Sequence, residues 1–432
     1  MKSSLYISIL CLLSTTGCML ATQTDERPNV VFILSDDQAW NDYGFMGHPH
    51  IDTPHLDKLA SESLVYERGY VTAPLCRPSL AGLVSGLHPH QNGIRGNDPI
   101  MPKGLDRNSV PLRARMTAPM DDHPSFIRAL TESGYATLQT GKWWEGNPVE
   151  HGFTDAMTHG DPKRKGRHGD VGLKIGRDTF QPYYDFVDRA VDAKQPFFVW
   201  YGVFLPHTPH NAPKRLQDKY TKVAPNQSTA KYWANVEWFD ETCGTLLEYL
   251  ETKGIAENTI IVYICDNGWV PDPKKPQRYQ RSKRDPFEAG IRTPIMVHHK
   301  GKVTAYHDTE TLASAIDIGP TILRACSVEV PAKMTGLDLR DTAALVERNQ
   351  VFVEAYEHDS NLDQLADLDN GLNARVVING WDKLIAWSDR TELYELKQDP
   401  DDRKDLSKTQ PEKVQTLNAI IDNWLKATSS QD

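Results

Sequence analysis

Short apolar runs that end in polar residues recur along the chain. The first, Asn29 to Leu34 (NVVFIL), is rich in β-branched residues and is followed at once by Ser35, Asp36 and Asp37. A run of this kind predicts a strand that is buried on both faces and presents polar groups at its carboxyl end. Segments with helical spacing separate it from similar runs. We predict further strands at 136–139, 196–204, 259–264 and 293–298, and helices at 54–70, 125–133 and 230–252.

Strands that alternate with helices predict an α/β fold, with a large, mostly parallel sheet flanked by helices. The pattern changes after about residue 350, where short strand-like runs follow one another and one more helix is expected, at 411–427. This change predicts a small C-terminal antiparallel sheet with a packed helix. The length of 432 residues exceeds the usual size of one compact domain. We therefore expect a larger domain at 27–349 and a smaller C-terminal subdomain at 350–432.

The amino terminus has the layout of an export signal. Lys2 precedes the apolar run from Leu5 to Leu13, which is too short to span a membrane. Residues 15–18 (TTGC) resemble a bacterial lipoprotein cleavage site with the lipid on Cys18, and plain secretion is the competing interpretation. We expect a signal peptide at 1–18. The mature protein would be periplasmic, secreted or an outer-surface lipoprotein, and would contact a membrane only through Cys18.

Charge and cysteine content narrow the classes of function. The chain has 48 Lys and Arg against 58 Asp and Glu, so it lacks the basic excess that favours a nucleic-acid partner. Attraction for an anionic substrate must therefore be local. The stretches 104–124 and 161–177 are rich in Lys, Arg, Gly and Pro, and we expect loops there that cover the site. Six cysteines without a C-x-x-C pair do not indicate a disulfide scaffold.

Polar clusters stand at the ends of three predicted strands. They are Asp36 with Asp37, His207, and Asp266 with Asn267. Ligands of parallel sheets bind beyond the carboxyl ends of the strands, so these residues predict one site. Oxygen donors without a matched set of Cys and His favour Ca²⁺ or Mg²⁺ over zinc. One such pair alone would be a helix cap or an Asx turn, whereas two pairs favour a metal site.

The segment 74–86 (PLCRPSLAGLVSG) resembles the signature of the type I sulfatases, in which the Cys, here Cys76, is oxidised to Cα-formylglycine. The resemblance runs from Arg27 to about Leu406 and implies an alkaline-phosphatase-like fold, with a catalytic domain at 27–349. Its other motifs are RPNVVFILSDDQ at 27–38, GLHPHQNGI at 86–94, TGKWW at 140–144, FLPHTPH at 204–210, CDNG at 265–268, SKRDPFEAGIRTP at 282–294 and ELYELKQDPDDRKDLS at 392–407.

The resemblance also implies a role for each matched residue. Cys76, as formylglycine hydrate, would be the nucleophile, and Lys142 and Lys283 would contact the sulfate oxygens. His207 would protonate or position the leaving alcohol. Such groups suit sulfate ester cleavage, because negative charge develops on the bridging and sulfuryl oxygens. Taken alone, these residues would be a buried thiol, surface ammoniums and a loop histidine. The implied ligands of Ca²⁺, or of Mg²⁺, are Asp36, Asp37, Cys76, Asp266 and Asn267.

Two positions depart from the family pattern. Leu80 replaces an Arg that holds the formylglycine and guides the maturation enzyme, and Trp144 replaces a His that assists breakdown of the sulfated diol. If a helix begins after Cys76, Arg77 and position 80 are neighbours on its surface, so we hypothesise that Arg77 fills the role of the missing Arg. Trp144 would wall the pocket, stack on a sugar or simply pack in the core. The candidates for a substitute proton relay are Glu145, His123, His168 and His210.

Three functions follow from these residues. The first is a sulfuric ester hydrolase that releases sulfate from a sulfated carbohydrate, matured by a formylglycine-generating enzyme. The second is a phosphoryl or phosphonyl hydrolase of the same superfamily, although Ser or Thr commonly serves as nucleophile in those relatives. The third is a metal-containing glycan-binding protein whose turnover is impaired by Leu80 and Trp144. The joint presence of the metal ligands, both lysines and His207 favours the first.

Overall fold

The computed structural model describes residues 27–272, 274 and 278–429, so the predicted signal peptide and Cys18 lie outside the described residues. Its main sheet has eight strands in the order β5-β4-β6-β1-β7-β8-β2-β9. The strands are β1 (Asn29–Ser35), β2 (Leu64–Tyr70), β4 (Ala136–Gly141), β5 (Asp155–Ala156), β6 (Phe197–Gly202), β7 (Thr259–Cys265), β8 (Arg292–His298) and β9 (Tyr306–Ser314).

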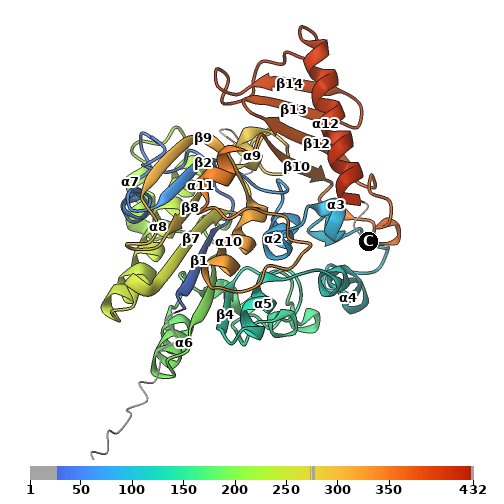
Figure 1. Ribbon diagram of the computed structural model, residues 1–432. Coiled ribbons are helices and arrows are strands. Elements are labelled where there is room, and N and C mark those ends of the chain that lie inside the picture. Colours follow the sequence, from blue (N-terminus) through green and yellow to red (C-terminus); the bar gives the residue numbers. More distant parts are fainter. Residues whose placement is uncertain (1–26, 273, 275–277, 430–432) are drawn as a thin grey trace, which may run out of the picture.

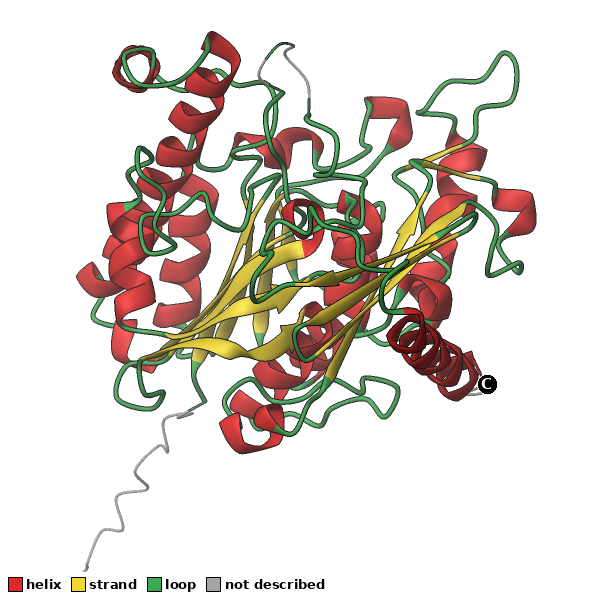
Figure 2. Ribbon diagram, turned by 90° about the horizontal axis from the view of Figure 1, so that it is seen from above, coloured by secondary structure: helices red, strands yellow, loops and turns green. Residues whose placement is uncertain are grey.

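The main sheet is mostly parallel, as predicted. Only β8 runs antiparallel to its neighbours, β7 and β2. Helices lie on both faces (Figures 1 and 2). The described helices of the main part are α1 (Pro54–Ser61), α2 (Cys76–Ser85), α3 (Pro89–Asn92), α4 (Val110–Thr117), α5 (Phe126–Glu132), α6 (Gln181–Asp192), α7 (Lys214–Tyr220), α8 (Gln227–Thr252), α9 (Glu288–Ile291), α10 (Ile318–Ala325) and α11 (Thr342–Val346).

The two faces of β1 explain its unbroken apolar sequence. Side chains alternate along a strand, so Val30 and Phe32 join the core that α2, α5 and α10 cover, whereas Val31 and Ile33 join the core beneath α1, α6 and α8. Both faces of β1 are therefore shielded from solvent. A central strand with this burial must be apolar at every position, and polar groups can appear only at its ends.

The predicted helix at 54–70 is wrong in its second half. Helix α1 ends at Ser61, and residues 64–70 form β2, which pairs with both β8 and β9. The apolar positions Leu56, Leu59 and Ala60 face the core with helical spacing, and Leu64 happens to continue that spacing. Burial between two strands decides the structure of the second half, and the β-branched and aromatic residues there suit it.

The predicted loop at 104–124 is also partly wrong, because it contains α4 and a 3₁₀ turn at Ala118–Asp122. Helix α4 begins with Val110 and Pro111, and proline is favoured at the start of a helix. Its Arg and Pro content therefore suggested a loop where a short surface helix forms. The stretch 161–177 contains the short 3₁₀ turns Pro162–Arg164 and Asp170–Lys174.

The C-terminal part matches the expected antiparallel sheet with a packed helix. Strands β10 (Gln350–Tyr356), β12 (Leu372–Asn379), β13 (Asp382–Trp387) and β14 (Thr391–Glu395) pair in that order, and α12 (Pro411–Ser429) crosses one face (Figure 1). Strand β11 (Asp359–Ser360) pairs with β3 (Asp98–Pro99) of the main part. The apolar core is continuous from the main sheet into β10 and β12. Among the described helices, none combines the length and the apolar character of a membrane span.

A buried ionic triad joins the C-terminal sheet to the main part. The Lys383 ammonium of β13 lies 3.0 Å from Glu288 Oε1 and 2.8 Å from Asp402 Oδ2, and all three side chains are almost inaccessible to solvent. Glu288 begins α9, five residues after Lys283. The triad therefore fixes the segment that carries Lys283 against the second sheet.

We expect Lys383→Met to lower the free energy of unfolding by about 3–5 kcal/mol, because it leaves two buried carboxylates without a counter-ion. The matched control is Lys413→Met, which removes a half-exposed partner of the neighbouring Asp382 and is expected to cost less than about 1 kcal/mol. Urea denaturation measures both. Equal losses for the two variants would contradict the importance of the triad.

Candidate functional site

The carboxyl ends of β1 and β7 bring two pairs of oxygen ligands together. The strands are neighbours, with Ser35 opposite Cys265, so Asp36 and Asp37 meet Asp266 and Asn267. Asp37 adopts a left-handed backbone conformation with φ of 67°, which turns it back toward the site instead of to the opposite face. Its backbone N–H donates to Asp266 Oδ1 at 3.0 Å, and Asn267 Nδ2 donates to Asp37 Oδ1 at 2.7 Å.

Cys76 is the first residue of α2 and is 1% exposed. Ligand atoms of Cys76, Asp36, Asp37 and His207 all lie within 4.8 Å of one another. The preceding residue, Leu75, has an extended backbone. The chain therefore reaches the site in an extended conformation and leaves it as helix α2. Burial raises the pKa of the Cys76 thiol to about 12, with Lys142 and Lys283 opposing that shift. An unmodified Cys76 is therefore a poor thiolate nucleophile at neutral pH.

Two buried lysines neutralise the carboxylates. Lys142, just beyond β4, places its Nζ 2.5 Å from Asp36 Oδ1 and 3.0 Å from Asp266 Oδ2. Lys283 places its Nζ 2.5 Å from Asp37 Oδ1 and 2.7 Å from Asp37 Oδ2. The predicted sulfate contacts are thus in the same cluster as the predicted metal ligands.

The pKa values show how burial and the lysines compete. Burial raises the pKa of Asp266 to about 6 against the attraction of Lys142, and it also raises the pKa of Asp36. At Asp37 burial acts in the same direction, but Lys283 and His207 outweigh it and the pKa falls below the usual range. Three carboxylates so close together are stable only with nearby positive charge.

Two oxygens of the cluster have no hydrogen-bond partner among the described residues. Asp36 Oδ2 and Asn267 Oδ1 are both buried and unpaired. A buried oxygen without a donor is costly, and a hard cation would satisfy both. The donor set of carboxylate and amide oxygens therefore fits Ca²⁺ or Mg²⁺ at Asp36, Asp37, Asp266 and Asn267.

His207 is the most open member of the cluster, with 21% of its side chain exposed. Its Nε2 lies 3.4 Å from Asp37 Oδ2, and its Nδ1 lies 2.7 Å from the Thr208 carbonyl oxygen. Its ring stacks on Phe204 at a centroid distance of 4.3 Å. Burial lowers its pKa to about 3, against the attraction of Asp37.

Arg177 holds the segment that carries His207, and the sequence did not single it out. Its guanidinium donates to the carbonyl oxygens of Phe204, at 2.9 Å from Nε, and His207, at 3.0 Å from Nη2. The signal available in the sequence was only the basic character of 161–177. Which of those basic side chains reaches a given carbonyl depends on how the loop folds.

Arg77 is buried and its guanidinium bonds to Glu145. Nε lies 2.7 Å from Glu145 Oε1 and Nη2 lies 2.8 Å from Oε2, and the guanidinium also donates to the carbonyl oxygens of Gly96 and Met116. Among the described residues, these side-chain hydrogen bonds reach no member of the metal-ligand cluster. The hypothesis that Arg77 takes over from the missing Arg therefore stays a prediction, and any such action would run through the position of α2. Leu80 lies in the apolar core.

The two adjacent tryptophans have different surroundings. Trp143 packs in the core against Phe153 and Trp200. Trp144 instead contacts the His168 ring at 5.2 Å and has the Arg167 guanidinium 4.7 Å from its own ring centroid. Both tryptophans are buried in the apolar core, so core packing accounts for both, and Trp144, which is 4% exposed, also lies beside a pocket.

The candidate proton relays are also sorted by their contacts. Both carboxylate oxygens of Glu145 accept from Arg77. The His168 ring contacts Phe204 at a centroid distance of 5.5 Å, and Phe204 in turn stacks on His207. His210 contacts Tyr232 and Trp269. Burial lowers the pKa of His123, and the charged groups that act on it, Asp122 and Lys333, are outside the cluster.

Comparison with known proteins identifies the family. Residues 28–328 match the model of the sulfatase family, and residues 280–431 match the C-terminal model of N-sulphoglucosamine sulphohydrolase. The chain therefore belongs to the formylglycine-dependent sulfatases of the alkaline-phosphatase-like superfamily, and it is a sulfatase.

Individual relatives have low sequence identity to this chain. N-acetylgalactosamine-6-sulfatase of Rattus norvegicus is 26% identical over 77% of this chain and 69% of the relative. An ulvan-active sulfatase of Formosa agariphila is 25% identical over 78% of this chain and 70% of the relative. A solved sulfatase of Pseudoalteromonas sp. has a TM-score of 0.68 at 21% identity and covers 94% of this chain and 92% of that chain.

Proposed function

We propose that this sulfatase hydrolyses a sulfate ester of a carbohydrate, with Cα-formylglycine made from Cys76. The observation that carries the proposal is the position of Cys76. It begins α2 inside a cluster of Asp36, Asp37 and His207 whose ligand atoms lie within 4.8 Å of one another. A formylglycine-generating enzyme would act on the segment during maturation.

The cluster would hold Ca²⁺, with Mg²⁺ as the alternative, through Asp36, Asp37, Asp266, Asn267 and residue 76. The two unpaired buried oxygens, Asp36 Oδ2 and Asn267 Oδ1, support this assignment. When bound, the ion would supply positive charge for a sulfate oxygen, and the formylglycine hydrate would supply the attacking oxygen.

The remaining residues would bind and protonate the substrate. The Lys142 and Lys283 ammoniums are held in the cluster by buried carboxylates, and they would bind the sulfuryl oxygens. The Nδ1 atom of His207 lies against the Thr208 carbonyl oxygen, which can only accept a hydrogen bond, so the ring proton is on Nδ1. The Nε2 atom faces the cluster. In that tautomer Nε2 carries no proton, so it would first take one up from water and then pass it to the oxygen of the leaving alcohol.

A carbohydrate substrate and an exported location fit together. The printed names of the relatives above concern N-acetylgalactosamine 6-sulfate and ulvan, which supports a carbohydrate substrate. The charged start, the apolar run and the TTGC segment of residues 1–18 support export, with or without a lipid on Cys18. We also retain the division into a catalytic domain at 27–349 and a C-terminal subdomain at 350–432.

Two measurements test the proposal. Peptide mass spectrometry of protein from its native source should find an aldehyde at position 76, and a panel of sulfated and phosphorylated sugars should yield free sulfate. An unmodified Cys76 thiol would contradict formylglycine chemistry. Release of phosphate in place of sulfate would favour the phosphoryl hydrolase, and binding without release would favour an impaired glycan-binding protein.

A further inference from the structure

Residues 204–212, called the His207 segment below, connect β6 to α7 and carry His207 to the edge of the site. The Asp36 N–H, just beyond β1, donates to the Leu205 carbonyl oxygen at 3.0 Å. Pro206 and Pro209 have no N–H group and cannot donate to a sheet ladder, so the segment leaves the sheet at this point. Its later carbonyl oxygens therefore need donors from elsewhere in the chain or from water.

Arg177 supplies donors on one side of the His207 segment. It follows Gly176, which has a φ of 70° and lies so close to β6 that a Cβ there would be 2.5 Å from the Tyr201 hydroxyl. The Arg177 guanidinium reaches the carbonyl oxygens of Phe204 and His207, at 2.9 Å from Nε and 3.0 Å from Nη2. Its Nη1 lies 2.8 Å from Asn211 Oδ1. One planar guanidinium thus fixes both ends of the segment.

Asn235 of α8 holds the middle of the same segment. Its side chain is fully buried, and its Nδ2 donates to the carbonyl oxygens of Pro206 and Pro209 at 3.2 and 3.3 Å. Its Oδ1 accepts from the Ala212 N–H at 2.9 Å. Among the described residues, all the side-chain hydrogen bonds of Asn235 go to the His207 segment. A buried amide with this set of bonds fixes the path of the backbone.

The His207 ring takes its orientation from the backbone that Arg177 and Asn235 hold. It stacks on Phe204 at a centroid distance of 4.3 Å, and its Nδ1 lies 2.7 Å from the Thr208 carbonyl oxygen. Both partners belong to the His207 segment. A shift of the segment would therefore carry the whole ring with it, and Nε2 would move relative to the cluster.

We propose that Arg177 and Asn235 are positioning residues for the proton transfer at His207. Both act through the backbone of the His207 segment, and neither belongs to the metal-ligand cluster. They would place Nε2 where it reaches the oxygen of the leaving alcohol, and a misplacement of about 1 Å costs up to about 100-fold in rate. The inference rests on the proposed function and adds two residues that set the rate of one of its steps.

A double-mutant cycle with His207 tests the inference on the full-length, matured protein. Lysine at position 177 keeps the positive charge but lacks the planar fork that reaches two carbonyl oxygens. For the sulfated sugar that the panel above shows to be hydrolysed fastest, Arg177→Lys should lower kcat about tenfold and change KM less than about twofold. In the His207→Ala protein the same substitution should lower kcat less than about twofold, because the ring it positions is gone.

Asn235→Ala tests the second contact in the same cycle. It should lower kcat about tenfold in the wild type and less than about twofold in the His207→Ala protein. The matched control is Asn226→Ala, at the start of the same helix, where Asn226 Oδ1 accepts from the Thr229 N–H at 2.9 Å. Loss of this cap should lower the thermal midpoint and leave the kcat of the folded protein unchanged.

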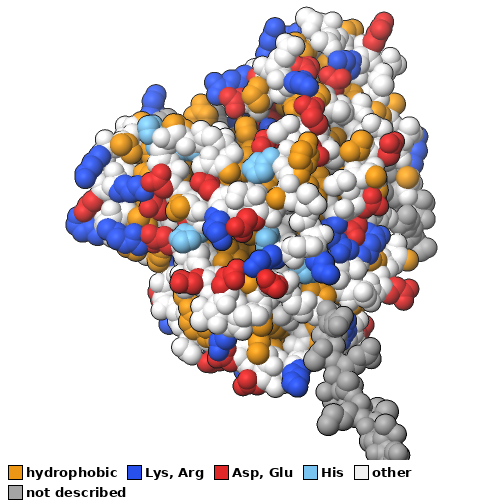
Figure 3. All heavy atoms as spheres, turned by 60° about the vertical axis from the view of Figure 1, so that its left-hand side comes forward, with side chains coloured by type: hydrophobic (Ala, Val, Ile, Leu, Met, Phe, Trp, Pro, Cys, Tyr) orange, Lys and Arg blue, Asp and Glu red, His pale blue; other side chains and the backbone are white. Residues whose placement is uncertain are grey.

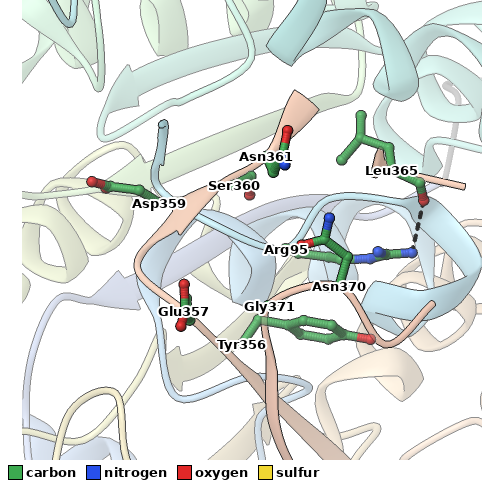
Figure 4. Close-up of a pocket in the computed structure, with 9 residues that line it drawn as sticks. All are labelled: Arg95, Tyr356, Glu357, Asp359, Ser360, Asn361, Leu365, Asn370 and Gly371. Atoms are coloured by element: carbon green, nitrogen blue, oxygen red, sulfur yellow. Dashed lines mark hydrogen bonds between the residues drawn. The ribbon is translucent and has the colours of Figure 1, made fainter. Parts of the chain in front are cut away.

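Arg95 is the matched control for Arg177, because its guanidinium also binds two carbonyl oxygens of one loop. Nη2 lies 3.0 Å from the Leu365 oxygen (Figure 4), and Nη1 donates to Asp367. The hollow beside Arg95 has a volume of only about 10 Å³, room for a single water. Arg95→Lys should have the same effect on kcat with and without His207, because it holds a different loop.

An exposed arginine supplies the baseline of the measurement. Charges of both signs are mixed over the face drawn in Figure 3, and solvent screens pairs of this kind. Arg215 is 60% exposed at its side chain and lies 2.5 Å from Glu241 Oε2. Arg215→Lys should leave kcat within about twofold in both backgrounds.

The outcomes separate this inference from the proposed function. If the wild type releases sulfate and the losses from Arg177→Lys and Asn235→Ala multiply with the loss from His207→Ala, the inference is overturned and the proposed function stands. An unchanged kcat in both Arg177→Lys and Asn235→Ala has the same meaning. An unchanged kcat in His207→Ala overturns the inference together with the role of His207. A wild type that releases sulfate from no sugar overturns the proposed function on which the inference rests.

Discussion

Cys76→Ala should stop sulfate release while the protein keeps its fold. Alanine removes the group that would become formylglycine, and loss of a nucleophile lowers turnover by ~10⁴-fold or more. The cavity left by one sulfur atom at a helix start is small, so the thermal midpoint should change little. Sulfate release and thermal unfolding on the same preparations measure both effects.

Another buried cysteine provides the control. Cys326, at the end of α10, is fully buried in the core and burial raises its pKa to about 11, yet it is outside the metal-ligand cluster. Cys326→Ala should retain turnover per folded molecule. Full activity of Cys76→Ala would show that this chain hydrolyses its substrate without a nucleophile at position 76.

Arg77→Ala should destabilise the protein strongly, by about 3–5 kcal/mol, because Glu145 would be left buried and unpaired. The hypothesis that Arg77 fills the role of the missing Arg would by itself imply loss of turnover with little loss of folding. The ion pair changes that expectation, since Arg77 and Glu145 are 2% and 4% exposed. Chemical denaturation measures the loss. Arg189→Ala, which breaks an exposed pair with Asp155, should cost less than about 1 kcal/mol.

The double variant Arg77→Met/Glu145→Met separates structure from chemistry. Replacing both buried charges with apolar side chains should restore most of the stability, because no unpaired charge remains. If Arg77 acts only by positioning α2, sulfate release should recover with the fold. If the guanidinium itself contacts substrate, the double variant should be stable and inactive. A stable Arg77→Ala would contradict the role of the pair.

The sequence was sufficient to predict that Asp36 and Asp37 come together with Asp266 and Asn267 at one edge of the sheet. A strand that is buried on both faces must be apolar at every position, so Asp36 and Asp266 could lie only at strand ends. Neighbouring parallel strands bring those ends together. The order of the strands in the sheet was not predicted, and one strand was missed. Strand β2 was hidden because Leu64 continues the helical spacing of α1, and only burial between β8 and β9 reveals it.

Long-range partners of charged residues were not predictable. Glu145 was considered as a proton relay, but the structure pairs it with Arg77, 68 residues away. Asp98 bonds to Arg167, 69 residues away in the sequence, and no local pattern relates the two. Such pairings depend on how loops fold over a finished sheet, whereas periodicity reports only on elements that face the core.

The continuous core beneath both sheets has a consequence for folding. Val30 and Phe32 of β1 share one apolar cluster with Val353 of β10 and Val376 of β12. The second sheet therefore cannot detach without exposing the first. The two parts should melt in a single cooperative step, and the most slowly exchanging backbone amides should be found on both sides of residue 350.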